Sequence, residues 1–158
     1  MRISTLMMLV SAVALADAKF ELENNTLKNA PVAFSGGSVK PDEASDASLK
    51  LVAEYLSEKS YISLMRIEVH VAAGTPKAAE LTKQRALELG KRLIAKGVDC
   101  KRLIAVGFGD SKPASADAAA NNRVLFVNAA LRGHAIGGMP VDGSGMVAGD
   151  LCGAASAN

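Results

Sequence analysis

Apolar side chains alternate with mostly polar ones over residues 63–71. A period of two places successive side chains on opposite faces of a β-strand, so a strand is predicted here. The face toward the core should carry the uniformly apolar set, which consists of Met65, Ile67, Val69 and Val71. The opposite face, which ends with a histidine at the end of the strand, carries Leu64, Arg66, Glu68 and His70.

Apolar residues recur at helical spacing after Pro41. This proline is followed by Asp42 and Glu43, and acidic side chains are favoured near the positive end of a helix. The stripe that follows, at i, i+3, i+4 and i+7, consists of Leu49, Val52, Ala53 and Leu56. This pattern predicts an amphipathic helix with one buried face.

A second helix is predicted after the alternating strand. Thr75 is expected as its N-cap and Pro76 as its first helical residue. It should extend to about Ala95 and end at Gly97, because glycine favours helix C-termini. Its buried stripe consists of Thr82, Ala86, Leu89 and Leu93.

Arg85 lies at the edge of this buried stripe, between Leu81 and Leu89. The stem of an arginine at such a position can be buried while its guanidinium emerges from the core. Two interpretations follow from the pattern. Arg85 either binds a carboxylate ligand, or it is a solvated helix residue that pairs with Glu80 or Glu88.

Three more strands are predicted, over residues 31–38, 103–107 and 123–131; the first of them ends in a Gly-Gly turn. The resulting order, β-α-β-α-β-β, predicts an α/β (α+β) two-layer sandwich with two helices on one face of a small mixed sheet. Residues 31–129 would form this domain. Residues 19–30 are a polar lead-in, and residues 130–158 are expected as a Gly/Ala-rich extended tail.

The first 18 residues have the features of a secretory signal peptide in the right order. Arg2 supplies the positive charge, residues 3–15 form a short apolar run, and an Ala-Asp-Ala cleavage pattern follows at residues 16–18. The alternative interpretation is a buried core helix. We find no second long apolar run and expect no transmembrane segment in the mature chain.

The two cysteines, Cys100 and Cys152, suit an exported protein that meets oxidising conditions. A disulfide between them would close a loop of about fifty residues and contribute about 4 kcal/mol in the chain-entropy model. Two unpaired thiols remain the alternative, because the sequence cannot test the geometry that a bridge requires.

Charge and motifs exclude several classes of function. A net charge of +2 and 4 % aromatic residues give no support for nucleic-acid binding. No cofactor is expected, because the G-x-G at Gly107 and Gly109 is not followed by a helix start, as a dinucleotide fingerprint would require. The two histidines, His70 and His134, have no metal-ligand spacing, and no catalytic constellation is visible, so neither a metal site nor an enzyme is expected.

Four motifs occur in an order that points to a known family. They are L-T-K-Q-R-A at 81–86, K-G-V-D-C-K-R-L at 96–103, G-F-G-D-S-K-P at 107–113 and N-N-R-V at 121–124. In combination they resemble the OmpA-like peptidoglycan-binding domain of outer-membrane proteins, over roughly residues 32–128.

This resemblance implies a periplasmic, outer-membrane- or cell-wall-associated protein that binds peptidoglycan noncovalently at the diaminopimelate of the stem peptide. Envelope proteins are further candidate partners. The arginine that takes the ligand's carboxylate falls on Arg85, and the aspartate that takes its ammonium falls on Ala72. The other ligand-binding positions that it implies are Leu81, Gly37, Ser38, Asn121 and Arg123. Structural roles fall on His70 and Gly74.

The chain departs from the family pattern at the expected ammonium site, where it reads Val69-His70-Val71-Ala72. Loss of one member of a partly desolvated charge pair commonly costs about 2–5 kcal/mol. Glu68 could replace the missing acid only if the end of the strand shifts. A degenerate domain that no longer binds the wall, and acts as an interaction or structural module, therefore remains the alternative.

Overall fold

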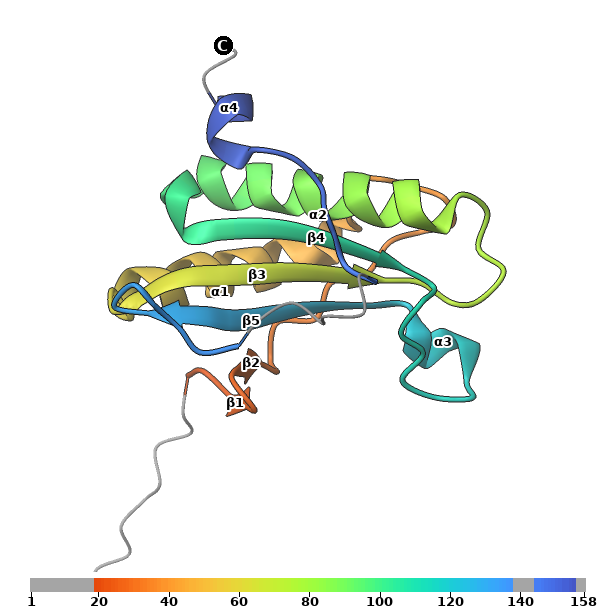
Figure 1. Ribbon diagram of the computed structural model, residues 1–158, viewed down its shortest axis with the longest axis horizontal. Coiled ribbons are helices and arrows are strands. Elements are labelled where there is room, and N and C mark those ends of the chain that lie inside the picture. Colours follow the sequence, from red (N-terminus) through yellow and green to blue (C-terminus); the bar gives the residue numbers. More distant parts are fainter. Residues whose placement is uncertain (1–18, 138–143, 156–158) are drawn as a thin grey trace, which may run out of the picture.

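The computed structural model describes residues 19–137 and 144–155 (Figure 1). The expected signal peptide at residues 1–18 lies outside the described residues. Within those two ranges, no helix is both long and apolar enough to cross a membrane.

A seven-stranded mixed sheet has the order β1-β2-β5-β3-β4-β7, with β6 also paired to β5. The central strand β3 (Ile62–His70) runs parallel to β4 (Leu103–Gly109) and antiparallel to β5 (Arg123–Leu131). Figure 1 shows α2 (Ala78–Ala95) along β4, with α1 (Asp46–Glu58) behind the sheet. Short helices precede α1, β4 and β5: η1 (Glu43–Ser45), η2 (Cys100–Arg102) and α3 (Ala118–Asn121).

The core lies between the sheet and the two long helices. One cluster unites the predicted core face of β3 with the predicted stripes of both helices, and its fully buried members include Met65, Ile67, Leu49, Val52, Leu56, Ala86, Leu89 and Leu93. Both helices therefore cover the same face of the sheet. The predicted two-layer α/β sandwich is confirmed.

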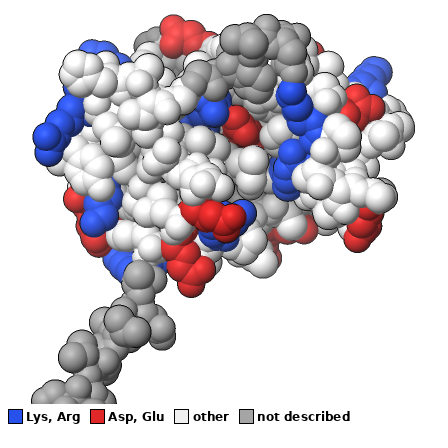
Figure 2. All heavy atoms as spheres, turned by 60° about the horizontal axis from the view of Figure 1, so that its bottom comes forward, with Lys and Arg blue, Asp and Glu red and all other residues white. Residues whose placement is uncertain are grey.

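The opposite face of β3 is also buried, although it carries charged side chains. Arg66, Glu68 and His70 are only 8, 7 and 4 % exposed. Elsewhere acidic and basic side chains are interspersed, as Figure 2 shows for one face of the molecule. β3 therefore carries a buried polar cluster on the face away from its apolar core side.

The predicted strand over residues 31–38 is wrong, because that segment is irregular. The backbone of Ala33 pairs with the start of the first helix instead: its N–H donates to Ser45 Oγ and its carbonyl accepts from the N–H of Asp42. The sheet position beside β5 is taken by a hairpin from the lead-in, formed by β1 (Leu22–Glu23) and β2 (Thr26–Leu27).

The turn of this hairpin explains why the lead-in folds back on itself. Asn24 and Asn25 both have positive φ, of 49° and 60°. Two consecutive left-handed residues form the two-residue turn whose twist suits an antiparallel hairpin, and asparagine tolerates this conformation well. The polar composition of the lead-in therefore specifies a turn.

The start of the second helix also differs from the prediction. α2 begins at Ala78, after Lys77 with a φ of 51°, so Thr75 and Pro76 are not its N-cap and first residue. The Thr75 hydroxyl donates to the carbonyl of Ala72 and closes a turn in the loop. The predicted end at Ala95 is confirmed, and Gly97 follows with a φ of 98°.

The C-terminal segment is more ordered than the expected extended tail. It contains β6 (His134–Ala135), β7 (Met146–Val147) and α4 (Leu151–Ala155). β7 pairs with β4, and the side chain of Leu151 packs on Gly90 of α2. The expected disulfide is present and joins Cys152 to Cys100.

Candidate functional site

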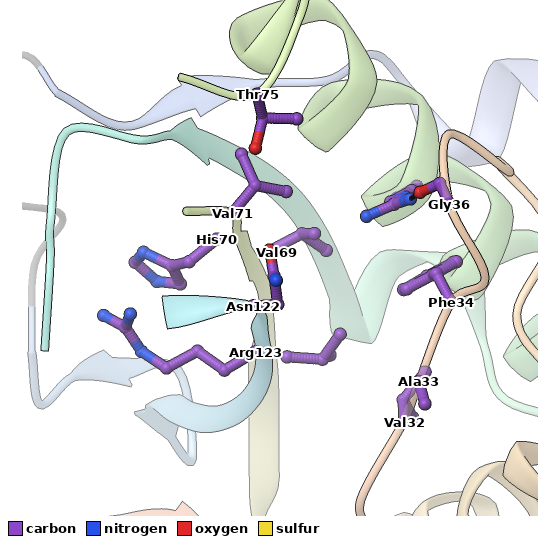
Figure 3. Close-up of a pocket in the computed structure, with 12 residues that line it drawn as sticks. Val32, Ala33, Phe34, Gly36, Val69, His70, Val71, Thr75, Asn122 and Arg123 are labelled. Carbon is purple, nitrogen blue, oxygen red and sulfur yellow. Dashed lines mark hydrogen bonds between the residues drawn. The ribbon is translucent and has the colours of Figure 1, made fainter. Parts of the chain in front are cut away.

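A hollow of about 300 Å³ opens at the C-terminal end of β3 (Figure 3). Four parts of the chain line it: residues 32–36, the end of β3 with the loop to α2, Arg85 of α2, and the start of β5 with the residue before it. Because these parts are far apart in sequence, the hollow exists only in the folded chain.

Arg85 is the most strongly held cation of the hollow, and it is only 5 % exposed. Its Nε donates to the carbonyl of Ser38 and its Nη2 to that of Gly36, both at 2.8 Å. Its guanidinium carbon lies 4.4 Å from the centre of the Phe34 ring, a cation–π contact. These bonds use two of the five N–H groups of a guanidinium, so the others can bind a ligand.

Arg85 makes no ion pair with a carboxylate among the described residues. The two acids that could have paired with it have other partners: Glu88 binds Arg92 at 2.9 Å, and Glu80 lies 3.3 Å from Lys83. Burial lowers the pKa of the Arg85 guanidinium. The interpretation of Arg85 as a solvated, paired helix arginine is therefore wrong.

The turn expected to join the site, at Gly37 and Ser38, does lie against Arg85. Gly36 adopts a φ of 54°, which glycine allows without strain. The Ser38 hydroxyl donates to the carbonyl of Lys40, while the Ser38 carbonyl accepts from Arg85. The turn thus presents backbone carbonyls to the guanidinium and fixes its position.

Ala72 lies just beyond β3, where the family resemblance places an acid. Its N–H donates to Asn122 Oδ1 at 3.0 Å, and its methyl group supplies no charge. Gly74 turns the same loop with a φ of 82°, and its N–H lies 3.4 Å from Asp110 Oδ2. Asp110 does not line the hollow.

Asn121, which the resemblance places at the ligand site, does not line the hollow. The Asn121 amide binds the backbone of Ala114 and Ser115, so it holds the loop before β5. Asn122 lines the hollow instead. The sequence shows two adjacent asparagines here. Successive side chains near the start of a strand point to opposite faces, so a shift of one residue decides which asparagine faces the hollow.

Phe34 and Thr75 line the hollow and were not predicted from the sequence. The predicted residues that do not line it also include Leu81, Ala72, Gly37 and Ser38. Phe34 could have been found as the one aromatic residue of its segment, since an arginine near the core often stacks on a ring. Leu81 is half-buried on α2.

His70 and Arg123 lie next to each other on the same side of the strand ends (Figure 3). The imidazole of His70 stacks on Phe108 with 4.6 Å between ring centres. Arg123 Nη2 donates to the carbonyl of Lys112. His70 Nδ1, His70 Nε2 and Arg123 Nη1 are buried and have no hydrogen-bond partner.

Glu68 is engaged beside these groups and does not line the hollow. Its carboxylate lies 2.6 Å from Arg66 Nε and 3.6 Å from His70 Nε2. Burial tends to raise the pKa of Glu68, but its contacts with His70 and Arg66 outweigh that effect and lower the pKa. Glu68 therefore does not replace the missing acid at Ala72.

Replacement of Glu68 by glutamine is expected to lower the free energy of unfolding by about 2 kcal/mol at neutral pH, because Arg66 loses a buried ionised partner. The pKa of Glu68 lies below its ordinary 4.5 in the fold, so the pair stabilises above that pH. The contribution is lost as pH falls through the lowered pKa. Urea unfolding should show a smaller difference in the free energy of unfolding between the wild-type chain and Glu68→Gln at about pH 3 than at about pH 7. An equal difference at both pH values would contradict a stabilising ion pair between Glu68 and Arg66.

The hollow is suited to binding a ligand with carboxylate and peptide groups. Among the described residues no group of three or more metal-ligating side chains occurs. The site offers guanidinium groups, an amide and backbone carbonyls, which recognise carboxylates and peptide groups.

Comparison with known proteins gives one family and several similar folds. A model of the OmpA family matches residues 33–125, more than half of the chain. The peptidoglycan-associated lipoprotein from Burkholderia pseudomallei is similar in structure, with a TM-score of 0.55 and 23 % identity, over 61 % of this chain and 87 % of that one. No curated protein sequence matches this chain.

A second solved structure is similar as well. It is the OmpA-like domain of FopA1 from Francisella tularensis subsp. tularensis SCHU S4, with a TM-score of 0.52 and 12 % identity, over 68 % of this chain and 75 % of that one. At these identities the two structures show that the fold is shared. The residues that match the family model include both long helices and every residue that lines the hollow except Val32.

Proposed function

Because the chain belongs to the OmpA family, we propose that it binds peptidoglycan noncovalently through the hollow at the end of β3. Domains of this family are in general binding modules without enzymatic activity. The proposed ligand is the stem peptide, at its diaminopimelate residue. The observation that carries the proposal is the position and state of Arg85.

Arg85 has the properties required of a carboxylate-binding group. It is buried, it is fixed by two backbone carbonyls and one aromatic ring, and no acid neutralises it. A guanidinium held in one orientation loses little further freedom when it binds a carboxylate. Its remaining N–H groups would bind the carboxylate of the stem peptide.

The proposed location is the periplasm, in association with the cell wall or outer membrane. Two observations support it: the signal-like order of residues 1–18 and the disulfide between Cys100 and Cys152, since disulfides persist in oxidising compartments. Envelope proteins are proposed as further partners of such a wall-associated module.

The test is sedimentation of the purified exported chain with isolated cell-wall sacculi. The chain is expected to pellet. Arg85→Ala should reduce the pelleted fraction at least tenfold, because it removes the buried guanidinium that would bind the carboxylate of the ligand. Arg85→Lys keeps the charge but not the forked geometry, and it should also bind more weakly.

The matched control is Arg92→Ala, which removes an arginine from the same helix at a position outside the hollow. It should pellet like the wild-type chain, and thermal unfolding should show that each variant is folded. If the wild-type chain stays in the supernatant while Ala72→Asp pellets, the degenerate, non-binding alternative is correct and the proposal fails.

A further inference from the structure

Two arginines and one histidine line the hollow, and no acidic residue does. They are Arg85, Arg123 and His70. Arg85 and Arg123 bind backbone carbonyls, and neither forms an ion pair among the described residues. Burial lowers the pKa of both guanidinium groups; for Arg123, Glu68 acts in the opposite direction.

Buried nitrogen atoms of His70 and Arg123 lie beside the hollow. His70 is 4 % exposed; its Nε2 lies 3.6 Å from Glu68, while its Nδ1 and Arg123 Nη1 have no hydrogen-bond partner among the described residues. Buried polar groups without partners are rare in folded proteins. Figure 3 shows His70 and Arg123 side by side, with the imidazole and the guanidinium pointing away from Phe34 and Gly36. The cation on the Phe34 side of the hollow is therefore Arg85.

The nearby acids do not reverse this balance. Glu68 pairs with Arg66, faces His70 and Arg123, and does not line the hollow. Asp110 is exposed and lies against the N–H of Gly74, outside the lining of the hollow. An ammonium group brought into the hollow would therefore be desolvated near the Arg85 guanidinium, with no carboxylate among the lining residues to pair with it.

Resting on the proposed function, we propose that the hollow selects stem peptides in which the second amino group of the diaminopimelate residue is acylated, as it is at a cross-link. Such a ligand keeps its carboxylate but has a neutral amide where an uncross-linked stem has an ammonium group. Asn122, which lines the hollow, can donate to the carbonyl of that amide.

Two soluble probes test this selectivity: a stem tripeptide with a free diaminopimelate side-chain amine, and the same peptide with this amine acetylated. Calorimetric titration of the exported chain should give at least tenfold tighter binding of the acetylated probe. Ala72→Asp adds an acid to the loop beside the hollow and should reverse the preference.

Ala73→Asp is the matched control, since it adds the same charge at the next, exposed position and should leave the preference unchanged. Asp110→Asn should leave it unchanged too. Thermal unfolding of each variant reports whether it is folded, and the wild-type preference is measured without any variant.

The outcomes separate this proposal from the proposed function. If the wild-type chain pellets with sacculi but binds the free-amine probe as tightly as the acetylated one, or tighter, the selectivity is overturned and wall binding stands. If it pellets but binds neither probe, the selectivity is overturned as well, because wall binding then uses another surface. If it does not pellet at all, both proposals fail.

Discussion

Replacement of both Cys100 and Cys152 by serine is expected to lower the free energy of unfolding by about 4 kcal/mol. The bridge joins residues 52 positions apart, and the loss of loop-closure entropy in the unfolded chain grows with that length. The other contacts of this end of the chain include a two-residue strand pair, the bond from the N–H of Ala148 to the carbonyl of Ala105, and the packing of Leu151.

Urea unfolding of the double variant and the wild-type chain, at equal pH, measures this effect. Wild-type protein treated with a reductant should approach the stability of the double variant, which separates loss of the bridge from any effect of the serines. Amide exchange at Ala148 should accelerate in both. A midpoint unchanged from that of the oxidised wild-type chain would show that the bridge does not stabilise the fold.

Gly107→Ala is expected to lower the free energy of unfolding by about 3 kcal/mol, because the contact between α2 and β4 has no space for a methyl group. A Cβ at this position would lie 2.5 Å from the backbone N of Lys83 and 2.7 Å from Thr82 Oγ1. The helix backbone cannot yield as a flexible side chain would. Separation of α2 from β4 would also stretch the bond from the N–H of Gly109 to Thr82 Oγ1.

The matched control is Gly37→Ala, because a Cβ on Gly37 meets no atom within 4 Å. Its urea midpoint should stay close to that of the wild-type chain, while the midpoint of Gly107→Ala should fall clearly. Equal midpoints for the two variants would contradict the close packing of α2 on β4.

The same close contact explains the G-x-G of the fourth strand. Gly107 allows the helix to approach, and Gly109 adopts a φ of 58° where the strand ends. These glycines serve packing and a turn, which agrees with the exclusion of a dinucleotide fingerprint from the sequence.

Periodic segments were predictable from sequence because period and burial are local. Met65, Ile67 and Val69 follow the period of two, and Leu89 and Leu93 follow helical spacing; all face the core. The strand beside β5 was not predictable in this way, because residues 31–38 and the lead-in are both short segments that could have paired with it. In the fold, the backbone of Ala33 bonds to Asp42 and Ser45 before the first long helix, and the lead-in pairs with β5.

The sequence could predict a site residue only where the helix or strand that carries it sets the direction of its side chain. Arg85 emerges from the core face of α2 as its spacing predicted, but its carbonyl partners come from residues 36–38, which no local pattern connects to it. Likewise, alternation placed Glu68 and His70 away from the core. It could not show that this face is buried as well.

The short strands at the two ends of the described chain have a consequence for solubility. β2 and β6 pair with the outer side of β5, and β7 with the outer side of β4, so segments from both ends cover the edges of the longest strands. Open strand edges recruit other chains and promote aggregation. A fragment trimmed to the family-matched residues 33–125 would lack these covers and most of β5, so it would expose the edges of β3 and β4.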